Sequence, residues 1–266
     1  MVRAAPGGGG VTQGELRALA ESVAREAGAL LREAFRSPDL RITSKSTPTD
    51  LVSEADHNAE RLIRERIASA RPDDGVLGEE GGDHSGTSGI RWVVDPLDGT
   101  VNFLFGIPQW AVSIAAEDEH GALVGVVYDP TRDELFSAER DGPPTLDGRP
   151  ITASTKADMA TALVGTGFGY DSEVRRAQSV IAARLLPEVR DLRRFGAAAI
   201  DLAWTACGRL DAYYEHGLNA WDLAAGGLIC ERAGLAVRPL EPVGPSNPGV
   251  LVAPSSLADA LEPWLA

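Results

Sequence analysis

The amino-acid sequence predicts a mixed α/β protein. Two helices pack on an antiparallel sheet in the first half, and strands alternate with helices in the second half. Two observations predict this fold class. In two long stretches up to residue 70, apolar side chains recur every three or four positions, which is the period of an amphipathic helix. After Ile151, short apolar runs alternate with helical patterns, which is typical of an α/β arrangement.

Length and composition agree with a large folded unit. The chain has 266 residues, of which 44% are hydrophobic and 24% charged. At roughly 150 residues per domain, this gives room for one large core or two fused parts. We expect a flexible leader over residues 1–12, a helix-and-sheet part over residues 13–150 and an α/β part over residues 151–266.

Charge and cysteine content exclude several kinds of partner. The 39 acidic and 25 basic residues leave a net charge of −14, which repels nucleic acid and anionic membrane surfaces. No apolar run has the length of a membrane span or of a signal peptide. Cys207 and Cys230 lie in apolar helical stretches, so two buried thiols are expected. These features indicate a cytoplasmic protein without a nucleic-acid or membrane partner.

The first half begins with two helices. The leader contains a run of four glycines that holds no fixed backbone conformation. The first helix is expected over residues 13–35, where an apolar stripe ends before a proline. The second is expected over residues 51–70, with Asp50 as its N-cap.

Short strands follow these helices. Two of them, residues 75–78 and 90–94, run directly into acidic residues. Turn residues join the next three strands, which predicts an antiparallel meander; they are residues 110–116, 122–128 and 134–138. Beyond residue 151 the expected order is strand 162–165, helix 172–186, strand 189–192, helix 196–207, strand 210–214 and helix 223–233.

The segment from Trp92 to Thr100 carries the strongest chemical signal. An apolar strand ends at Asp95, and Asp98 follows three residues later. Gly99 permits close approach to the backbone, and Thr100 adds a hydroxyl, so the loop can present N–H groups to an anion beside the acids. Carboxylates this close repel each other, and hard oxygen ligands favour Mg²⁺ as the neutralising cation. The alternative is a solvated Asp-Pro turn.

Because this motif is present, three further acids become candidates for the same site. Glu79 follows strand 75–78 and lies near Asp95 if the two strands are neighbours; alone, it would be an ordinary charged loop. Asp56 falls on the apolar stripe of the second helix, where a charge needs a metal or a bond to a helix end. Asp222 precedes an apolar helical run, so it can act as an N-cap, a metal ligand or both.

Four segments of the chain match a known family: residues 45–56 (KSTPTDLVSEAD), 78–80 (GEE), 95–103 (DPLDGTVNF) and 221–226 (WDLAAG). Together they resemble the inositol monophosphatase family. Their order and spacing match over essentially the whole chain after the leader, and the Asp-Pro-Leu-Asp-Gly-Thr motif with the late Trp-Asp is highly specific. The resemblance implies a layered α/β/α/β/α sandwich of the sugar-phosphatase type. It also implies a Mg²⁺-dependent, lithium-sensitive phosphomonoesterase that is commonly a homodimer.

The resemblance further implies a role for individual residues. The metal ligands for two or three Mg²⁺ ions are Glu79, Asp95, the Leu97 carbonyl, Asp98 and Asp222. All but Asp222 place the metal site in the part over residues 13–150. The catalytic residues that activate water are Asp56, Thr100 and Glu79. The substrate contacts are Asp98, Gly99, Thr100, Ala198, Glu215 and Asp222, with phosphate on the Gly99 and Thr100 amides.

The expected substrate is a small anionic phosphomonoester, inositol 1-phosphate, hydrolysed to myo-inositol and phosphate by metal-activated water. Related family phosphatases act on fructose 1,6-bisphosphate, histidinol phosphate or 3′-phosphoadenosine phosphates with the same metal core. The tract over residues 213–222 favours the inositol members. A haloacid-dehalogenase nucleophile motif is disfavoured, because two residues and not one separate the aspartates. A non-catalytic binding or regulatory protein with this fold remains the alternative of another class.

Overall fold

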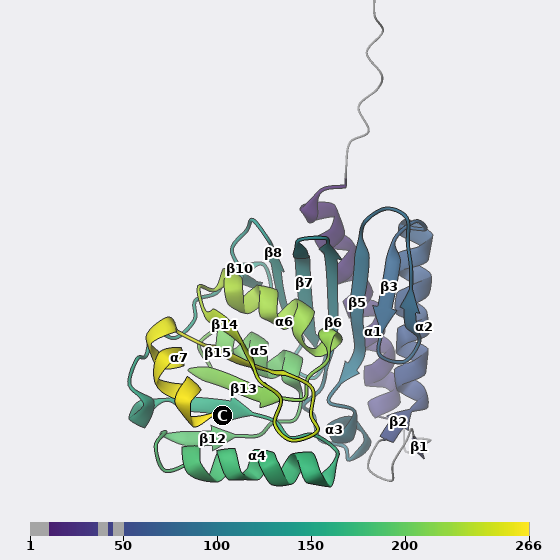
Figure 1. Cartoon of the computed structure of the whole chain (residues 1–266). Helices are drawn as coiled ribbons and strands as arrows, with labels where there is room; N and C mark the ends of the chain where they lie inside the picture. The colour runs from purple at the N-terminus through teal and green to yellow at the C-terminus, as the bar shows by residue number, and fades with distance from the viewer. Residues whose placement is uncertain (1–10, 37–41, 45–50, 266) are drawn as a thin grey trace, which may run out of the picture.

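The computed structural model describes residues 11–36, 42–44 and 51–265, and it has five layers in the order α/β/α/β/α (Figure 1). Two helices cover one face of a large sheet, two lie between this sheet and a smaller one, and two cover the outer face of the smaller sheet. The layered fold expected from the sequence is confirmed. In this order the helices are α1 (Gln13–Phe35) and α2 (Glu54–Ala70), α5 (Ala198–Ala206) and α6 (Ala220–Arg232), and α4 (Ser172–Leu185) and α7 (Ser255–Leu261).

Helix α1 has the bounds that the sequence predicts, and its start is capped. The Thr12 hydroxyl accepts the N–H of Glu15 at 3.2 Å, and the Glu15 carboxylate accepts the N–H of Thr12 at 2.8 Å. This reciprocal pair is a capping box. Thr12, which we placed in the leader, therefore belongs to the folded part, whereas residues 1–10 lie outside the described residues.

Helix α2 begins at Glu54 and not at Leu51 as expected. Residues 51–53 instead form strand β2 (Leu51–Ser53), which pairs antiparallel with β1 (Ile42–Ser44). A strand hydrogen bond with a neighbouring segment competes with helix extension, and this pairing cannot be read from helical periodicity. The expected N-cap, Asp50, lies outside the described residues.

Eight of the described strands form the large sheet, in the order β10-β9-β8-β7-β6-β5-β3-β4. Strands β6, β7 and β8 are antiparallel neighbours, which confirms the expected meander, and β5 also pairs antiparallel with β6. Strand β3 pairs in parallel with β5, and Gly78 lies opposite Val94, so Glu79 and Asp95 follow side by side at one sheet edge. The strands are β3 (Gly75–Gly78), β4 (Gly82–His84), β5 (Arg91–Asp98), β6 (Ala111–Asp118), β7 (Gly121–Asp129), β8 (Glu134–Glu139), β9 (Thr145–Leu146) and β10 (Arg149–Pro150).

Five of the described strands form the smaller sheet, in the order β12-β11-β13-β15-β14. The alternation of strands and helices predicts β11 to β13 correctly, and β11 is parallel to both of its neighbours. Strands β14 and β15 and helix α7 were not expected. Strand β15 pairs antiparallel with both β13 and β14, which completes the sheet. The strands are β11 (Leu163–Thr166), β12 (Asp191–Arg193), β13 (Ala212–His216), β14 (Ala236–Leu240) and β15 (Gly249–Ala253).

The middle layer packs closely on the large sheet because small residues meet at the contact. A Cβ on Gly125 of β7 would lie 2.6 Å from the carbonyl oxygen of Ala225 on α6. A glycine is therefore required for this approach. The apolar core between the two sheets contains side chains from both sides of residue 150, so the two parts of the chain share one core.

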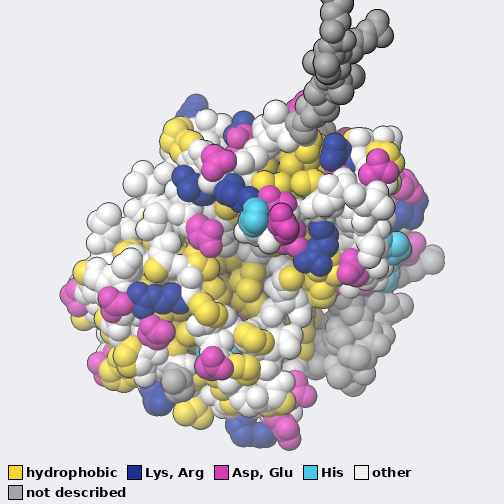
Figure 2. Space-filling view, turned by 45° about the horizontal axis from the view of Figure 1, so that its top comes forward, with side chains coloured by type: hydrophobic (Ala, Val, Ile, Leu, Met, Phe, Trp, Pro, Cys, Tyr) yellow, Lys and Arg dark blue, Asp and Glu magenta, His cyan; other side chains and the backbone are white. Residues whose placement is uncertain are grey.

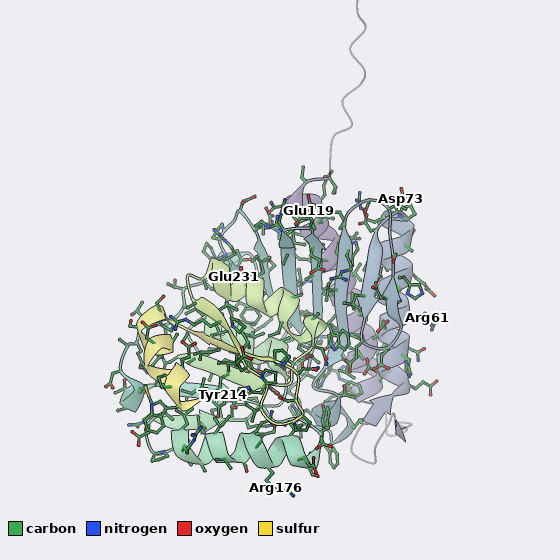
Figure 3. The ribbon with its side chains drawn as sticks, in the orientation of Figure 1. Arg61, Asp73, Glu119, Arg176, Tyr214 and Glu231 are labelled. Carbon is green, nitrogen blue, oxygen red and sulfur yellow. The ribbon has the colours of Figure 1, made fainter. Side chains whose placement is uncertain are left out.

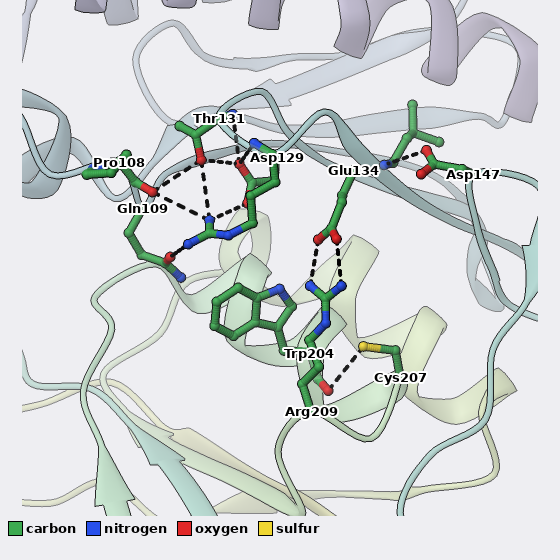
Figure 4. A network of polar contacts seen from close by, with 11 residues as sticks. Pro108, Gln109, Asp129, Thr131, Glu134, Asp147, Trp204, Cys207 and Arg209 are labelled. Carbon is green, nitrogen blue, oxygen red and sulfur yellow. Dashed lines mark hydrogen bonds and ion pairs between the residues drawn. The ribbon is translucent and has the colours of Figure 1, made fainter.

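Charged side chains also join the two parts of the chain (Figure 4). Arg132, after β7, donates to Asp129 at 2.6 Å, and its guanidinium lies 4.9 Å from the ring centre of Trp204 on α5. Arg209 donates to both carboxylate oxygens of Glu134 at 2.5 and 2.6 Å, and also stacks on Trp204. Paired guanidinium groups over one indole favour a fixed orientation of α5 against the large sheet.

The outer surface mixes both signs of charge. On the face that Figure 2 presents, acidic and basic side chains are interspersed with apolar ones. No helix within the described residues is long and apolar enough to cross a membrane. Both cysteines are free thiols: Cys230 is buried as expected, whereas Cys207 is half-buried because it forms the C-cap of α5.

Candidate active site

An acid-lined pocket lies where the ends of β3, β5 and β13 meet the first turns of α5 and α6. Its cavity has a volume of about 190 Å³. Arg194 is the one basic side chain among the described residues that line it. Five acidic side chains line the same cavity, so the pocket carries a strong excess of negative charge. They are Glu79, Asp95, Asp98, Glu215 and Asp222.

A bulge in β5 directs Asp95 and Asp98 into this one pocket. In a regular strand, residues three positions apart face opposite sides of the sheet. The pairing with β6 steps from Asp95–Ser113 to Asp98–Ala111, so β5 uses three positions where β6 uses two. The extra residue restores a common direction for the two carboxylates. Pro96 restricts the backbone between them.

The turn after Asp98 depends on Gly99. The φ of Gly99 is +90°, and a Cβ at this position would lie 2.8 Å from the carbonyl oxygen of Gln109. A side chain would be strained on both counts. The chain then forms the short helix α3 (Thr100–Leu104), where Asn102 donates to the carbonyl oxygens of Gln109 and Phe195, each at 2.8 Å. These bonds tie α3 to the segment that leads into α5.

Asp98 is held by the first turn of α5. The residue is 7% exposed, and its two carboxylate oxygens accept the N–H groups of Ala198 at 3.1 Å and Ala199 at 2.8 Å. Burial raises the pKa of Asp98 to about 7, and the nearby carboxylate of Glu215 adds to this, whereas the two backbone bonds lower it. Ala198, an expected substrate contact, thus lines the pocket and orients an acid.

Asp95 lies among other carboxylates at the end of β5. It is 2% exposed, and its Oδ1 accepts the N–H of Leu97 at 3.0 Å. Burial raises the pKa of Asp95 well above its ordinary value, and the charges of Glu79, Asp98 and Asp222 raise it further. Buried carboxylates that repel one another require neutralisation, either by protons or by a cation.

Asp222 lies inside the first turn of α6, whereas the N-cap position was one of the two roles that the sequence allowed for it. The helix begins at Ala220, with Asn219 as N-cap. The carboxylate of Asp222 accepts the N–H of Asn219 at 2.6 Å, so an acid in the first turn satisfies the start of the helix from within. Burial raises the pKa of Asp222 well above its ordinary value, and Asp98 and Glu79 contribute in the same direction.

Asp56 reaches the pocket through Thr100. Asp56 is fully buried in the first turn of α2. The Thr100 hydroxyl lies 3.5 Å from the Asp56 carboxylate and 3.0 Å from the carbonyl oxygen of Leu97. A hydroxyl has one proton to donate, so the shorter bond, to Leu97, is the stronger of the two. Asp56, Thr100 and Leu97 therefore form one connected group at the pocket wall.

Glu215 is fixed at the end of β13 by its neighbours. The Tyr213 hydroxyl donates a short hydrogen bond to it, and a Cβ on Gly167 would fall 1.9 Å from its carboxylate. Burial raises the pKa of Glu215, whereas the Tyr213 bond and the charge of Arg194 lower it. A further acid, Asp201 of α5, is 1% exposed, and its pKa is raised by burial and then by Glu215 and Asp98.

The donor set suits a hard divalent cation. All five acidic side chains offer carboxylate oxygen and Leu97 adds a carbonyl, which are the ligands that Mg²⁺ prefers over zinc-type sulfur and imidazole donors. The raised pKa values of Asp95, Asp98 and Asp222 also indicate charge that the protein's own cations leave uncompensated. Across residues 11–36, 42–44 and 51–265, no three acidic, histidine or cysteine side chains already converge as a metal cage. The match between this pocket and a divalent cation therefore depends on the chemistry of the oxygen donors and not on a preformed metal cage.

The structure brings the residues expected at the site to one place. Asp56 contacts Thr100 without lining the cavity. The acid motif is local in sequence, which explains why it could be found without a structure. The expected residues that line the pocket are Glu79, Asp95, Leu97, Asp98, Gly99, Thr100, Ala198, Glu215 and Asp222.

Nine residues that line the pocket were not among the expected site residues. They are Phe168, Gly169, Tyr170, Arg194, Gly196, Gly217, Leu218, Asn219 and Trp221. The signal that could have found the first two is the glycine-spaced tract over residues 165–169, because glycines permit close approach of the backbone to a pocket. Arg194 stands in a run of arginines and carries no local motif.

The fold and the pocket define a class: layered α/β phosphatases of the sugar-phosphatase type, with acidic oxygens gathered at strand ends. Comparison with known proteins gives the family. The sequence model of the inositol monophosphatase family matches residues 12–262. The chain belongs to the inositol monophosphatase family, whose members are phosphatases that are generally metal-dependent.

Individual relatives match nearly the whole chain. An inositol-1-monophosphatase of Mycobacterium leprae is 43% identical over 93% of this chain and 92% of its own. A Nus factor SuhB of Xylella fastidiosa is 39% identical over 90% of each chain. The crystal structure of the extragenic suppressor protein suhB of Bartonella henselae has a TM-score of 0.87 at 34% identity, and covers 94% of this chain and 98% of that one.

Proposed function

We propose that the protein is a Mg²⁺-dependent phosphomonoesterase that hydrolyses inositol 1-phosphate to myo-inositol and phosphate. The observation that carries the proposal is the set of five acidic side chains around one small cavity, in a chain that belongs to a phosphatase family. Such a pocket repels a phosphate ester unless cations are bound in it. Bound metal ions would therefore neutralise the acidic side chains and allow the anionic substrate to enter the pocket.

Two or three Mg²⁺ ions would be held by the proposed ligands, which are the carboxylates of Glu79, Asp95, Asp98 and Asp222 and the carbonyl of Leu97. When bound, the metal lowers the pKa of a water and stabilises the departing alkoxide of an in-line displacement. The protein orients these ligands from three places: the end of β3, the bulge of β5 and the first turn of α6. Because water is the nucleophile, no covalent phosphoenzyme is required.

Proton transfer falls to Asp56 and Thr100. The Thr100 hydroxyl can accept the proton of an attacking water while donating its own toward the Asp56 carboxylate, 3.5 Å away. Asp56 is fully buried, which keeps bulk water from competing for that proton. In the proposal, the backbone N–H groups of Gly99 and Thr100 bind the phosphate oxygens.

The substrate ring would lie against Glu215, Ala198, Asp98 and Asp222. An ionised carboxylate only accepts hydrogen bonds, so Glu215 suits a ligand rich in hydroxyl donors and disfavours a second phosphate nearby. The Tyr213 hydroxyl fixes one oxygen of Glu215 and leaves the other for the ring. A polyol monophosphate fits this arrangement better than fructose 1,6-bisphosphate or a nucleotide bisphosphate.

Both parts of the chain would contribute to the active site. Residues 13–150 would carry most metal ligands, and residues 151–266 would complete the substrate side through Ala198, Glu215 and Asp222. From the family resemblance we also propose a cytoplasmic homodimer whose activity is inhibited by lithium.

A second candidate function is a binding role without catalysis. The relative from Xylella fastidiosa that bears the name Nus factor SuhB motivates it. That reading predicts a folded protein with no phosphatase activity.

The experiment that tests the proposal is turnover of a substrate panel by pure protein with Mg²⁺. The panel contains inositol 1-phosphate, fructose 1,6-bisphosphate, histidinol phosphate and 3′-phosphoadenosine 5′-phosphate. The highest kcat/KM is expected for inositol 1-phosphate. A higher kcat/KM for any other member would reassign the substrate, and the absence of turnover on all four would favour the binding role.

A further inference from the structure

We propose that Glu60 and Arg64 of α2 are positioning residues for the carboxylate of Glu79, because they fix the turn between β3 and β4 that carries it. This inference rests on the proposed role of Glu79 as a metal ligand. Neither residue lines the acidic pocket. They would act on the metal site from outside, through the backbone on either side of Glu79.

Glu60 binds the backbone directly after Glu79. Its side chain is 3% exposed, and its two oxygens accept the N–H groups of Glu80 and Gly81, each at 2.7 Å. Bonds from two successive backbone donors to one carboxylate are charge-assisted and fix the orientation of the peptide planes. The direction of the chain immediately after Glu79 is therefore set by Glu60.

Arg64 completes the clamp across the two strands. Its Nε donates to Glu60 at 2.6 Å, and its Nη2 donates to the carbonyl oxygen of Gly82 at 2.6 Å. Its Nη1 lies 3.5 Å from the carbonyl oxygen of Val76 on β3 and 3.0 Å from the His84 ring on β4. One guanidinium thus bonds to both strands of the turn and to the acid that holds it. A lysine lacks this planar fork and could not make the same set of bonds.

The sequence of the turn is matched to this clamp. A Cβ on Gly78 would lie 2.5 Å from Glu60 Oε1, and a Cβ on Gly81 would lie 2.6 Å from the same atom. Both glycines flank the two glutamates, so side chains at these positions would displace the clamp. Space for Glu60 and Arg64 explains why the pair Glu79-Glu80 stands between glycines.

The clamp also couples the two sides of the proposed site. Glu60 lies four residues after Asp56 on the same helix, so both carboxylates are on one face of α2. Asp56 contacts Thr100, and Glu60 contacts the turn that carries Glu79. One helix would therefore carry both the proton-accepting group and the residue that positions the metal ligand.

The test uses two variants that break the clamp from opposite sides, Glu60→Gln and Gly81→Ala. The first places an amide N–H₂ against backbone N–H donors, and the second fills the space that Glu60 Oε1 occupies. The control is Glu65→Gln, which removes an acid of the same helix whose ion pair with Arg61 is 3.6 Å long and 64% exposed on the Glu65 side. Arg61 projects from α2 away from the protein (Figure 3).

Three quantities are measured: Mg²⁺ affinity of the metal-free protein by calorimetry without substrate, melting temperature in EDTA, and kcat at saturating Mg²⁺. Outer residues that orient metal ligands typically change metal affinity by about 10- to 100-fold, and we expect a loss of this size in both clamp variants. We expect kcat at saturating Mg²⁺ to stay within about threefold of wild type. Glu65→Gln should leave all three unchanged.

A purely structural role would lower the melting temperature of the clamp variants and leave their Mg²⁺ affinity within about twofold of wild type; that result overturns the inference. If Glu60→Gln does not fold, Gly81→Ala decides, because it leaves α2 intact. A wild-type protein that binds Mg²⁺ without phosphatase activity refutes the proposed function. The comparison of Mg²⁺ affinity between wild type and the clamp variants would still show whether Glu60 and Arg64 position Glu79. A wild-type protein that binds no Mg²⁺ overturns both.

Discussion

The metal-free protein should lose stability as pH rises from about 5 to about 8, and Mg²⁺ should restore it, because the pocket carboxylates must ionise against one another. The pKa shift of Asp98 gives the direction in which stability changes with pH. Burial, together with the charge of Glu215, raises its folded-state pKa from the ordinary value of 3.8 to about 7. Between these two values the folded state holds a proton that the unfolded state has lost. The free energy of unfolding therefore falls with rising pH in this window.

The magnitude follows from the same shift. The difference between 3.8 and about 7 is about three pKa units, or about 4 kcal/mol at roughly 1.4 kcal/mol per unit. The pKa values of Asp95 and Asp222 are raised in the same direction. Bound Mg²⁺ would hold these groups ionised and cancel the loss. About two of the three pKa units of Asp98, or about 3 kcal/mol, fall between about pH 5 and about pH 7. For a chain of this size, that effect of Asp98 alone corresponds to a melting-temperature change on the order of 10 °C.

His216 titrates close to this window and Asp118 titrates below it, and neither changes the test. Burial lowers the pKa of His216, so its contribution to stability rises with pH, opposite in sign to Asp98. Asp118, whose pKa is lowered to about 2 by Arg140, is ionised in both states above about pH 5 and contributes no slope there. Both contributions are the same with and without Mg²⁺.

The assay is thermal unfolding of EDTA-treated protein, with and without added Mg²⁺, at about pH 5.5 and about pH 8. We expect the gain in melting temperature from Mg²⁺ to be larger at the higher pH. An equal gain at both values, or a larger gain at the lower pH, would show that uncompensated carboxylates do not limit the stability of the metal-free protein.

Three substitutions and one matched control test separate parts of the account. Asp56→Asn should lower kcat by about 10²- to 10⁴-fold, the range for a lost general base, with an unchanged melting temperature; a wild-type kcat would return Asp56 to a structural role. Glu215→Gln should lower kcat/KM for inositol 1-phosphate roughly tenfold, and leave para-nitrophenyl phosphate nearly unaffected. An equal loss on both substrates would make Glu215 a scaffold residue. Gly125→Ala should cost about 1–3 kcal/mol in denaturant unfolding, because its Cβ would meet Ala225 at 2.6 Å. Gly227→Ala, with open space around its Cβ, should be neutral or stabilising by up to about 1 kcal/mol; equal losses would contradict the packing argument.

Elements with a long amphipathic pattern could be predicted from the sequence, and their limits could be predicted where a cap is local. Helix α1 combines both features, and its bounds agree with the prediction. Helix α2 was predicted three residues too long, because the pairing of residues 51–53 with β1 is a contact between segments. Strands β14 and β15 lie on either side of a stretch rich in proline and glycine, and they form by pairing with each other.

The acids of the site could be predicted because Asp95 to Thr100 is one short motif and strand neighbours bring Glu79 beside it. What could not be predicted is how the motif bends: the bulge that gives Asp95 and Asp98 a common direction is a property of pairing with β6. Arg194 and Tyr170 reach the pocket only through the fold. The position of Asp222 within α6 depends on Asn219, three residues earlier, as the N-cap.

Release of phosphate from inositol 1-phosphate by EDTA-treated protein tests the central claim most directly, before and after Mg²⁺ is added back, in wild type and in Asp95→Asn. The carboxylate of Asp95 is buried among Glu79, Asp98 and Asp222, and its loss leaves bound metal charge undercompensated. We predict no measurable activity without Mg²⁺, recovery in wild type when Mg²⁺ returns, and no recovery in Asp95→Asn. Activity that stays within about threefold of the untreated enzyme after EDTA treatment would contradict the metal mechanism.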